Sequence, residues 1–132
     1  MPGEGPIKVL VVDDHASIRK GISSLINAEW PHMTCVGAAA TAAEALSLTR
    51  ECQPQVVLLD INLDGHDGLA LIPVLRNLAP CEIVVVTSLS DPRVVTHARR
   101  LGAHACLHKT APATELVAAV FAAHQAHDSM PL

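Results

Sequence analysis

The sequence contains few aromatic side chains and no long apolar segment. Although half of its 132 residues are hydrophobic, Trp30 and Phe121 are the only members of the Phe/Tyr/Trp group, so the core must be packed with aliphatic residues and alanine. No apolar run approaches the roughly 20 residues that a membrane-spanning helix needs, and no membrane contact is expected. The segment Met1–Pro6 lacks the basic and apolar regions of a signal peptide, which predicts a cytoplasmic protein.

Cysteine and basic residues are also used sparingly. Scattered single thiols without a Cys-x-x-Cys pair fit a reducing cytosol better than a disulfide framework; they are Cys35, Cys52, Cys81 and Cys106. The formal net charge of -4 gives no electrostatic reason to expect that this chain binds nucleic acid. The chain has eight histidines but no zinc-binding spacing of cysteine and histidine, so a dedicated histidine metal site is not expected.

Short runs of branched apolar residues alternate with amphipathic stretches along the chain. The runs predict β-strands at residues 7–12, 33–38, 56–59, 83–87 and 103–107. After each strand, apolar residues repeat with helical spacing, as at Ile18, Ile22 and Leu25. Strands that alternate with single helices predict an α/β fold with parallel strands and right-handed crossovers. The helices must then cover both faces of a doubly wound five-stranded sheet, which makes a three-layer (βα)5 sandwich.

Local sequence signals predict where several of the helices begin. The stretch Thr41–Glu44 is typical of a capping box, so the second helix should start there and run to about Cys52. Pro73 lies inside the third predicted helix and should disturb its first turns. The other starts are predicted at Asp67-Gly68, at the cap and proline of Ser90-Asp91-Pro92, and at Thr110.

The chain is organised around the strand that ends in Asp60. Val56–Leu59 has no polar residue, which is typical of a strand buried on both faces of a parallel sheet. Polar residues also follow or end three other strands: Asp13 and Asp14, Thr87, and Lys109. In a doubly wound sheet these strands are neighbours, and their carboxyl ends form the edge where ligands bind. We therefore expect these five polar side chains to share one pocket.

The charges of these residues indicate phosphoryl transfer. Two carboxylates about 4 Å apart repel by roughly 4 kcal/mol at an effective dielectric constant near 20, so three acids need a cation or a proton between them. Carboxylate oxygens suit Mg²⁺, a lysine can hold a phosphoryl oxygen, and a threonine hydroxyl can donate to another. An aspartate nucleophile would give an acyl phosphate. Each residue alone is better explained as a turn, cap or surface residue, but the combination favours this chemistry.

Several short motifs resemble those of response regulator receiver domains, the phosphoacceptor domains of two-component signalling. The motifs are Val11-Val12-Asp13-Asp14-His15, Leu58-Leu59-Asp60, Asp67-Gly68-Leu69, Val86-Thr87-Ser88 and His108-Lys109. The set is highly specific, and the resemblance extends from about Ile7 to Ala126. It is strongest to receivers of the LuxR/FixJ type, which carry a helix-turn-helix domain. The resemblance implies a CheY-like, flavodoxin-like fold with the strand order 2-1-3-4-5.

The resemblance implies a role for each site residue. Asp60 would be the phosphorylated aspartate, Thr87 would move toward the phosphoryl group, and Lys109 would pair with it. Mg²⁺ or Mn²⁺ would be bound by Asp13, Asp14, Asp60 and the backbone carbonyl of Asn62. A sensor histidine kinase would donate the phosphoryl group. Beyond its own phosphorylation and autodephosphorylation, the chain would not be an enzyme.

The resemblance also sets expectations for domains and partners. Residues 1–6 would be an N-terminal extension, 7–126 the receiver domain, and 127–132 a C-terminal tail or the start of a linker. The receiver would control a DNA-binding output domain outside this sequence, with a stand-alone receiver as the alternative. Phosphorylation would drive homodimerisation through the fourth helix, fifth strand and fifth helix, or through the first and fifth helices. The candidate contact residues are Val94, Val95, His97, Arg99 and Arg100. The alternative explanation is core packing for the valines and a solvated surface for the arginines.

Three positions depart from the family pattern. Cys106 stands where the family commonly has an aromatic residue, which puts the usual coupling between threonine and aromatic ring in doubt. Asp64 replaces a common proline in the loop after Asp60, which loosens the turn and adds negative charge. Thr110 replaces the proline that usually follows the lysine. None of these changes removes a catalytic group.

Other classes of function fit the sequence less well. A haloacid-dehalogenase-like phosphatase would need a second acid two residues after a nucleophile at Asp13, and His15 occupies that position. A flavodoxin-like or nucleotide-binding module would need a glycine-rich, phosphate-cradling loop after the first strand, where this chain has acids. A receiver fold that only binds partners and is never phosphorylated is the main rival. Cys106 favours this rival, and the complete set of site residues opposes it.

Overall fold

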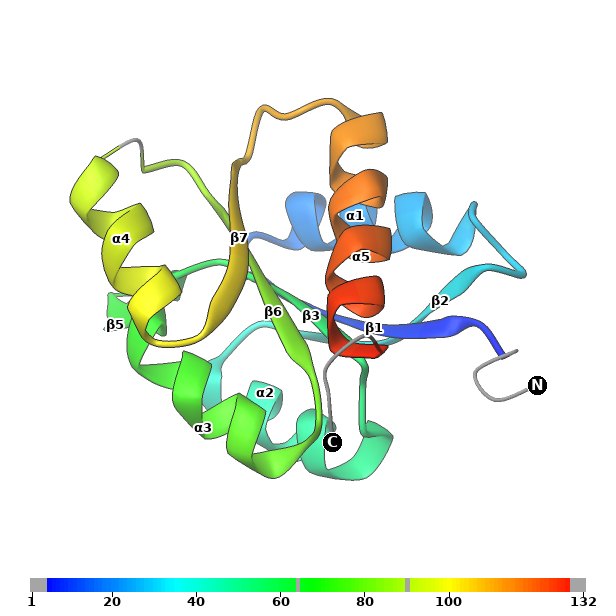
Figure 1. Cartoon of the computed structure of the whole chain (residues 1–132), viewed down its shortest axis with the longest axis horizontal. Coiled ribbons are helices and arrows are strands. Elements are labelled where there is room, and N and C mark those ends of the chain that lie inside the picture. Colours follow the sequence, from blue (N-terminus) through cyan, green and yellow to red (C-terminus); the bar gives the residue numbers. More distant parts are fainter. Residues whose placement is uncertain (1–4, 64, 90, 129–132) are drawn as a thin grey trace.

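The computed structural model describes residues 5–63, 65–89 and 91–128, with only the backbone described at His66 and Asp128. Parallel strands form a five-stranded sheet in the order β2-β1-β3-β6-β7, which can be followed in Figure 1. Their bounds are β1 Ile7–Val12, β2 Met33–Ala39, β3 Val56–Leu59, β6 Glu82–Thr87 and β7 Ala103–His108. The predicted doubly wound α/β fold is confirmed, as is the order 2-1-3-4-5 of its main strands.

The helices cover both faces of the sheet (Figure 1). Their bounds are α1 Ala16–Asn27, α2 Ala42–Cys52, α3 Leu71–Leu78, α4 Pro92–Arg100 and α5 Ala113–Asp128. On one face, α1 and α5 contribute Ile26, Leu116 and Val120 to a buried cluster. On the other face, α2, α3 and α4 surround a second buried cluster, to which α4 contributes Ala98. In the part of the chain that the structure describes, no helix is long and apolar enough to cross a membrane.

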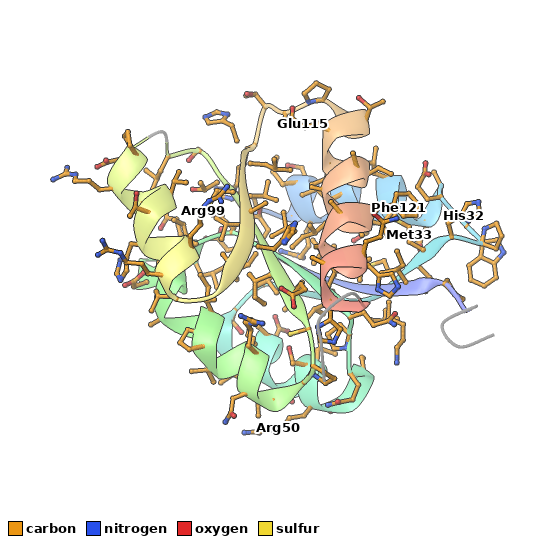
Figure 2. The ribbon with its side chains drawn as sticks, viewed as in Figure 1. His32, Met33, Arg50, Arg99, Glu115 and Phe121 are labelled. Carbon is orange, nitrogen blue, oxygen red and sulfur yellow. The ribbon has the colours of Figure 1, made fainter. Side chains whose placement is uncertain are left out.

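The core is aliphatic, as the sparse aromatic content predicts. The largest fully buried side chains among the described residues are leucine, isoleucine, valine and methionine. Phe121 is only partly buried; its ring meets that of His32 edge to face, with 6.4 Å between the ring centroids. Figure 2 shows Phe121 on α5 beside Met33, where β2 begins. The aromatic ring thus closes one border of the core and does not fill its centre.

The segment between β3 and α3 contains structure that the sequence pattern did not predict. Two short strands, β4 (Asn62–Leu63) and β5 (His66–Asp67), pair antiparallel, and a 3-10 turn at Gly68–Ala70 precedes α3. Asp67 caps this turn by accepting a hydrogen bond from Leu69 N. The prediction that Asp67-Gly68 opens an α-helix is therefore wrong by one turn. An α-helix from Gly68 would need residue 73 to donate to the Leu69 carbonyl, and Pro73 has no N–H.

Two other predicted helix starts are confirmed. Thr41 accepts a hydrogen bond from Glu44 N at 3.1 Å and caps α2. The Glu44 carboxylate accepts one from the Ala40 amide at 2.8 Å, so the capping box closes one residue earlier than in the usual pattern. Asp91 caps α4 by accepting from Arg93 N, whereas Ser90 lies outside the described residues.

The last helix, α5, starts and ends later than predicted. The prediction that Thr110 caps it is wrong, because the helix begins at Ala113 and the Thr110 hydroxyl lies 2.7 Å from His108 Nδ1. Pro112 causes this shift, since the residue before a proline is disfavoured in the helical conformation. At the other end, the helix continues through His127 to Asp128, two residues into the predicted tail.

Candidate functional site

Backbone hydrogen bonds bring the carboxyl ends of several strands to one edge of the sheet. The amide of Asp13 donates to the last carbonyl of β2 at 3.0 Å, and the amide of Asp60 donates to the last carbonyl of β1 at 2.9 Å. Farther along the sheet, the amide of Lys109 donates to the last carbonyl of β6 at 2.9 Å. These bonds continue the parallel ladder past the strand ends. The three residues therefore emerge together at the carboxyl edge.

Asp13, Asp60 and Lys109 form a buried network of charges. Asp13 and Asp60 are each 2% exposed. Lys109 Nζ lies 2.9 Å from Asp60 Oδ2 and 3.1 Å from Asp13 Oδ2. The other oxygen of Asp60, Oδ1, accepts a hydrogen bond from Asn62 N at 3.0 Å. Since both oxygens of the Asp60 carboxylate have a partner, its orientation is fixed.

The environment of Lys109 keeps it protonated. Burial disfavours the charged amine, but the hydrogen bonds and charges of Asp60 and Asp13 outweigh burial and raise the pKa of Lys109 above its usual value. Lys109 therefore carries its charge at neutral pH. It can balance only one of the carboxylates at this edge, so excess negative charge is left.

His15 and Asp14 complete the cluster. His15 Nδ1 lies 3.0 Å from Asp13 Oδ1 and 3.0 Å from Asp14 Oδ1. Single ligand atoms from Asp13, Asp14, His15 and Asp60 all lie within 4.8 Å of one another. Hard carboxylate oxygens in this number, with excess negative charge, suit a divalent cation such as Mg²⁺. The donor set thus fits the cation that the sequence predicts.

Thr87 and Asn62 lie at the same edge with different partners. Thr87 is 3% exposed, and its hydroxyl accepts a hydrogen bond from Leu89 N at 3.2 Å. The hydroxyl therefore holds the loop after β6. Asn62 is exposed, and it contributes its amide N–H to Asp60. Of the predicted site residues, the structure brings Asp13, Asp14, Asp60 and Lys109 into one cluster. Thr87 ends β6 beside this cluster and is not one of its members.

The loop after Asp60 is held closed by a backbone contact that only glycine permits. Gly68 N donates to the Ile61 carbonyl at 2.7 Å. A Cβ at Gly68 would lie 2.5 Å from Ile61 Cα, closer than two such atoms can approach. This contact fixes the backbone directly after Asp60, and with it the Asn62 amide. The predicted effect of Asp64 concerns a residue outside the described ones.

The predicted interaction residues on α4 fall into two groups. Val94 packs against the core, whereas His97, Arg99 and Arg100 are exposed. Cys106, on the neighbouring strand β7, is half-buried against the same core cluster. Burial raises the pKa of the Cys106 thiol, and the charge of Arg99 lowers it by less. The core explanation is therefore sufficient for Val94, whereas the exposed side chains of Arg99 and Arg100 are available to a partner.

His15 and Arg19, which had no predicted role, both hold Asp13. Arg19 Nη1 donates to the Asp13 carbonyl at 2.8 Å, and the His15 amide donates to Asp13 Oδ1 at 2.8 Å. The position of His15 directly after two acids was a signal for such a contact. Arg19 lies inside α1, six residues from Asp13, and no spacing in the sequence indicated that its side chain reaches back to the Asp13 carbonyl.

Comparison with known proteins gives consistent matches over nearly the whole chain. Residues 9–121 match the family described as the response regulator receiver domain. The transcriptional regulatory protein LiaR of Bacillus subtilis (strain 168) is 35% identical over 118 residues, which cover 89% of this chain and 56% of LiaR. The chain thus spans about half the length of the curated relatives it matches.

Solved structures agree with this assignment. The signal receiver domain of the response regulator NarL from Mycobacterium tuberculosis has a TM-score of 0.84 and 28% identity, and the match covers 96% of this chain and 99% of that one. A response regulator protein from Burkholderia pseudomallei, solved with a phosphorylated aspartic acid, a calcium ion and citrate, has a TM-score of 0.80 and 25% identity. That match covers 92% of this chain and 72% of that one.

Proposed function

Because the chain belongs to the response regulator receiver family, we propose that it accepts a phosphoryl group on Asp60. The observation that carries this proposal is the setting of the Asp60 carboxylate. This carboxylate is buried, it ends the central strand, and its two oxygens face the Asn62 amide and the Lys109 ammonium group. A carboxylate held in this way is oriented for attack on phosphorus, and the Lys109 ammonium group can bind an oxygen of the incoming phosphoryl group.

In the proposed reaction, a phosphoryl group moves from a nitrogen or oxygen atom of the donor to an oxygen atom of Asp60. One oxygen of Asp60 attacks the phosphorus in line with the leaving atom. The bond from phosphorus to the donor breaks, the donor keeps the electron pair, and an acyl phosphate forms on Asp60. Lys109 pairs with a phosphoryl oxygen, because its three N–H donors can turn from the carboxylate to a neighbouring oxygen.

We assign a divalent cation, Mg²⁺ or Mn²⁺, to Asp13, Asp14 and Asp60, with the backbone carbonyl of Asn62 as a further ligand. When bound, such an ion neutralises charge on the phosphoryl oxygens. The compact donor set of the acids supports this assignment, as does the calcium ion in the phosphorylated Burkholderia pseudomallei relative. Arg19 and the His15 amide hold Asp13 in place for this task.

Thr87 is the residue that we propose to report phosphorylation. Its hydroxyl accepts from Leu89 N. Rotation of the side chain toward a phosphoryl oxygen, to which the hydroxyl would donate, would carry the hydroxyl away from that amide and move the loop that leads into α4. Cys106 supplies no aromatic ring to transmit this movement. We therefore propose that the movement is read by a partner at the exposed residues Arg99 and Arg100 of α4. We propose that this face, or that of α1 and α5, mediates homodimerisation.

The wider setting follows from the relatives. We propose that this protein is cytoplasmic and that a sensor histidine kinase is its phosphoryl donor. We propose no enzymatic activity beyond the chain's own phosphorylation and dephosphorylation. Since LiaR is a transcriptional regulatory protein and the match covers only 56% of it, we propose that the full protein controls transcription through a separate DNA-binding output domain. Residues 7–126 would then be the receiver domain, with 1–6 as an extension and 127–132 as a tail or linker.

Intact mass after incubation with acetyl phosphate and Mg²⁺ tests the proposal. The wild type should gain the mass of one phosphoryl group, and Asp60→Asn should gain none. Asp91→Asn is the matched control, because Asp91 is an acid at the start of α4 outside the site, and it should be labelled like the wild type. Equal labelling of Asp60→Asn and wild type would exclude Asp60 as the acceptor.

A partner-binding module that is never phosphorylated is the second candidate. The observation in its favour is Cys106, because the thiol replaces the aromatic ring that couples phosphorylation to output. The same mass experiment separates the two functions. Absence of labelling in wild type, with kinase or small donor, would leave the binding module as the function of this fold.

A further inference from the structure

His15 occupies a capping position but does not cap its helix. It is the residue before α1, where a polar side chain usually accepts hydrogen bonds from the first amides of the helix. Its backbone is extended, with φ −87° and ψ 112°, and its side chain makes no capping hydrogen bond. The imidazole is turned back toward the acids of the carboxyl edge. Capping therefore does not explain the orientation of this side chain.

The Nδ1 atom of His15 lies close to both hydrogen-bond acceptors and a hydrogen-bond donor. It lies 3.0 Å from one oxygen of Asp13 and 3.0 Å from one oxygen of Asp14, which both require a donor. It also lies 3.2 Å from Lys109 Nζ, which requires an acceptor. One ring nitrogen can donate or accept, but it cannot do both. A cation beside Nδ1 removes this conflict, because it takes the nitrogen lone pair and the carboxylate oxygens as ligands together.

We propose that His15 is a nitrogen ligand of the cation site and makes the site prefer transition-metal ions such as Mn²⁺ over Mg²⁺. This inference rests on the proposed cation site of Asp13, Asp14 and Asp60. Imidazole binds first-row transition metals well, whereas Mg²⁺ strongly prefers oxygen ligands. A nitrogen donor among carboxylates therefore raises the affinity for Mn²⁺ and leaves the affinity for Mg²⁺ nearly unchanged. His15 acts as a specificity-determining residue for the metal.

Electron spin echo spectroscopy of bound Mn²⁺ tests the proposal, because a directly coordinated nitrogen couples to the electron spin. Wild-type protein loaded with Mn²⁺ should show this nitrogen coupling, and His15→Asn should lose it. His108→Asn is the matched control: His108 is exposed and precedes Lys109, and its ring lies against Thr110 and the Ser88 carbonyl. The control should keep the coupling.

Calorimetric titrations give an independent reading of selectivity. In His15→Asn, the ratio of Mn²⁺ to Mg²⁺ affinity should fall by about tenfold, while the Mg²⁺ affinity changes by less than about threefold. In His108→Asn, both affinities should match the wild type. Equal losses of Mn²⁺ and Mg²⁺ affinity in His15→Asn would mean that the imidazole only orients the acids.

The inference and the proposed function fail in distinguishable ways. Mn²⁺ that binds the wild type without nitrogen coupling, or coupling that survives in His15→Asn, overturns the role of His15 alone, provided that Asp60 is still phosphorylated. Coupling that survives in Asp13→Asn places the ion elsewhere and overturns it as well. A wild type that binds neither ion and is not phosphorylated overturns both.

Discussion

The two edges of the sheet each bury a carboxylate against basic side chains, but with a different charge balance. At the carboxyl edge, Asp13, Asp14 and Asp60 face the single lysine Lys109. At the amino edge, Glu82 contacts Arg76 and His127, and we term these three residues the amino-edge cluster. Glu82 is 6% exposed, and its Oε2 lies 3.4 Å from Arg76 Nη2 and 3.1 Å from His127 Nδ1.

The amino-edge cluster links three elements of the fold through side-chain contacts. Glu82 begins β6, Arg76 lies on α3, and His127 lies in the last turn of α5. Arg76 Nη1 also donates to the Gly102 carbonyl at 3.0 Å. Gly102 has a φ of +113°, and a Cβ there would lie 2.7 Å from the Arg76 guanidinium. Each charge in this cluster already has a partner from another element.

The charge balance of a buried acid distinguishes a ligand-binding site from a contact that only stabilises the fold. A buried acid whose charge is balanced by the protein has no need of a ligand, and its removal should only weaken the fold. Buried acids in excess of their cations are held against repulsion, and a cation or a phosphoryl group changes their energy. Loss of an acid should therefore change stability in opposite directions at the two edges.

The largest effect on stability is expected at the amino edge. Glu82→Gln should lower the free energy of unfolding by about 2 kcal/mol, because Arg76 and His127 lose the charge of their common acceptor. Urea unfolding measures this loss. Glu115→Gln, at the exposed start of α5 (Figure 2), is the control and should change stability by less than about 0.5 kcal/mol. Equal values for both variants would show that the amino-edge cluster does not stabilise the fold.

Lys109→Gln should have the next largest effect, and it should depend on pH. Without metal, the substitution should cost about 1.5 kcal/mol, since two buried carboxylates lose a charged donor. Because the folded protein raises the pKa of Lys109, this stabilisation is fully present below the unfolded value of 10.5 and is lost as the pH rises through the folded value. Urea unfolding of wild type and variant with chelator, from pH 8 upward, should show the two curves converging. A difference that does not shrink at high pH would contradict the charge assignment.

Asp13→Asn should change stability in the opposite direction from Glu82→Gln. In chelator, removal of one charge relieves repulsion with Asp14 and Asp60 more than it weakens the pair with Lys109, so the free energy of unfolding should rise by about 1 kcal/mol. Mg²⁺ at ten times its dissociation constant should stabilise the wild type by about 1.4 kcal/mol and should hardly affect this variant. Glu82→Gln should keep the full Mg²⁺ response. Destabilisation of Asp13→Asn in chelator would contradict the excess of negative charge.

His127→Gln should have the smallest effect, a loss of about 0.5 kcal/mol, because its side chain is 33% exposed. Glutamine can still donate one hydrogen bond to Glu82. A double-mutant cycle with Glu82→Gln measures the coupling between the two side chains. Additive losses would mean that the end of α5 is held by packing alone and not by the amino-edge cluster.

Most of the fold could be predicted because its signals are local. The uninterrupted apolar run Val56–Leu59 predicted the central strand, and the capping residues Thr41 and Asp91 predicted two helix starts correctly. The failures occurred where proline removes a backbone donor or restricts its neighbour. Pro73 converts the first turn before α3 into a 3-10 turn, and Pro112 moves the start of α5.

The site was predicted in part for the same reason. The sequence shows directly which strands end in an acid, a hydroxyl or a lysine. Once the strand direction and order are predicted, these ends are expected to meet at one edge. The sequence pattern could not indicate that His15 turns away from its helix, that Arg19 reaches the Asp13 carbonyl, or that Gly68 touches Ile61. These contacts depend on side-chain rotamers and loop paths, which local propensity does not specify.

By itself, the sequence determined the order of elements, the aliphatic core and the chemical groups at the carboxyl edge, because periodicity and residue type act over a few neighbouring positions. Only the tertiary structure decided how the charges are balanced. Lys109 meets Asp13 and Asp60 across the sheet, and Glu82 meets Arg76 and His127 at the opposite edge. Charge balance depends on distances of a few ångströms between residues far apart in the chain, and folding alone sets those distances.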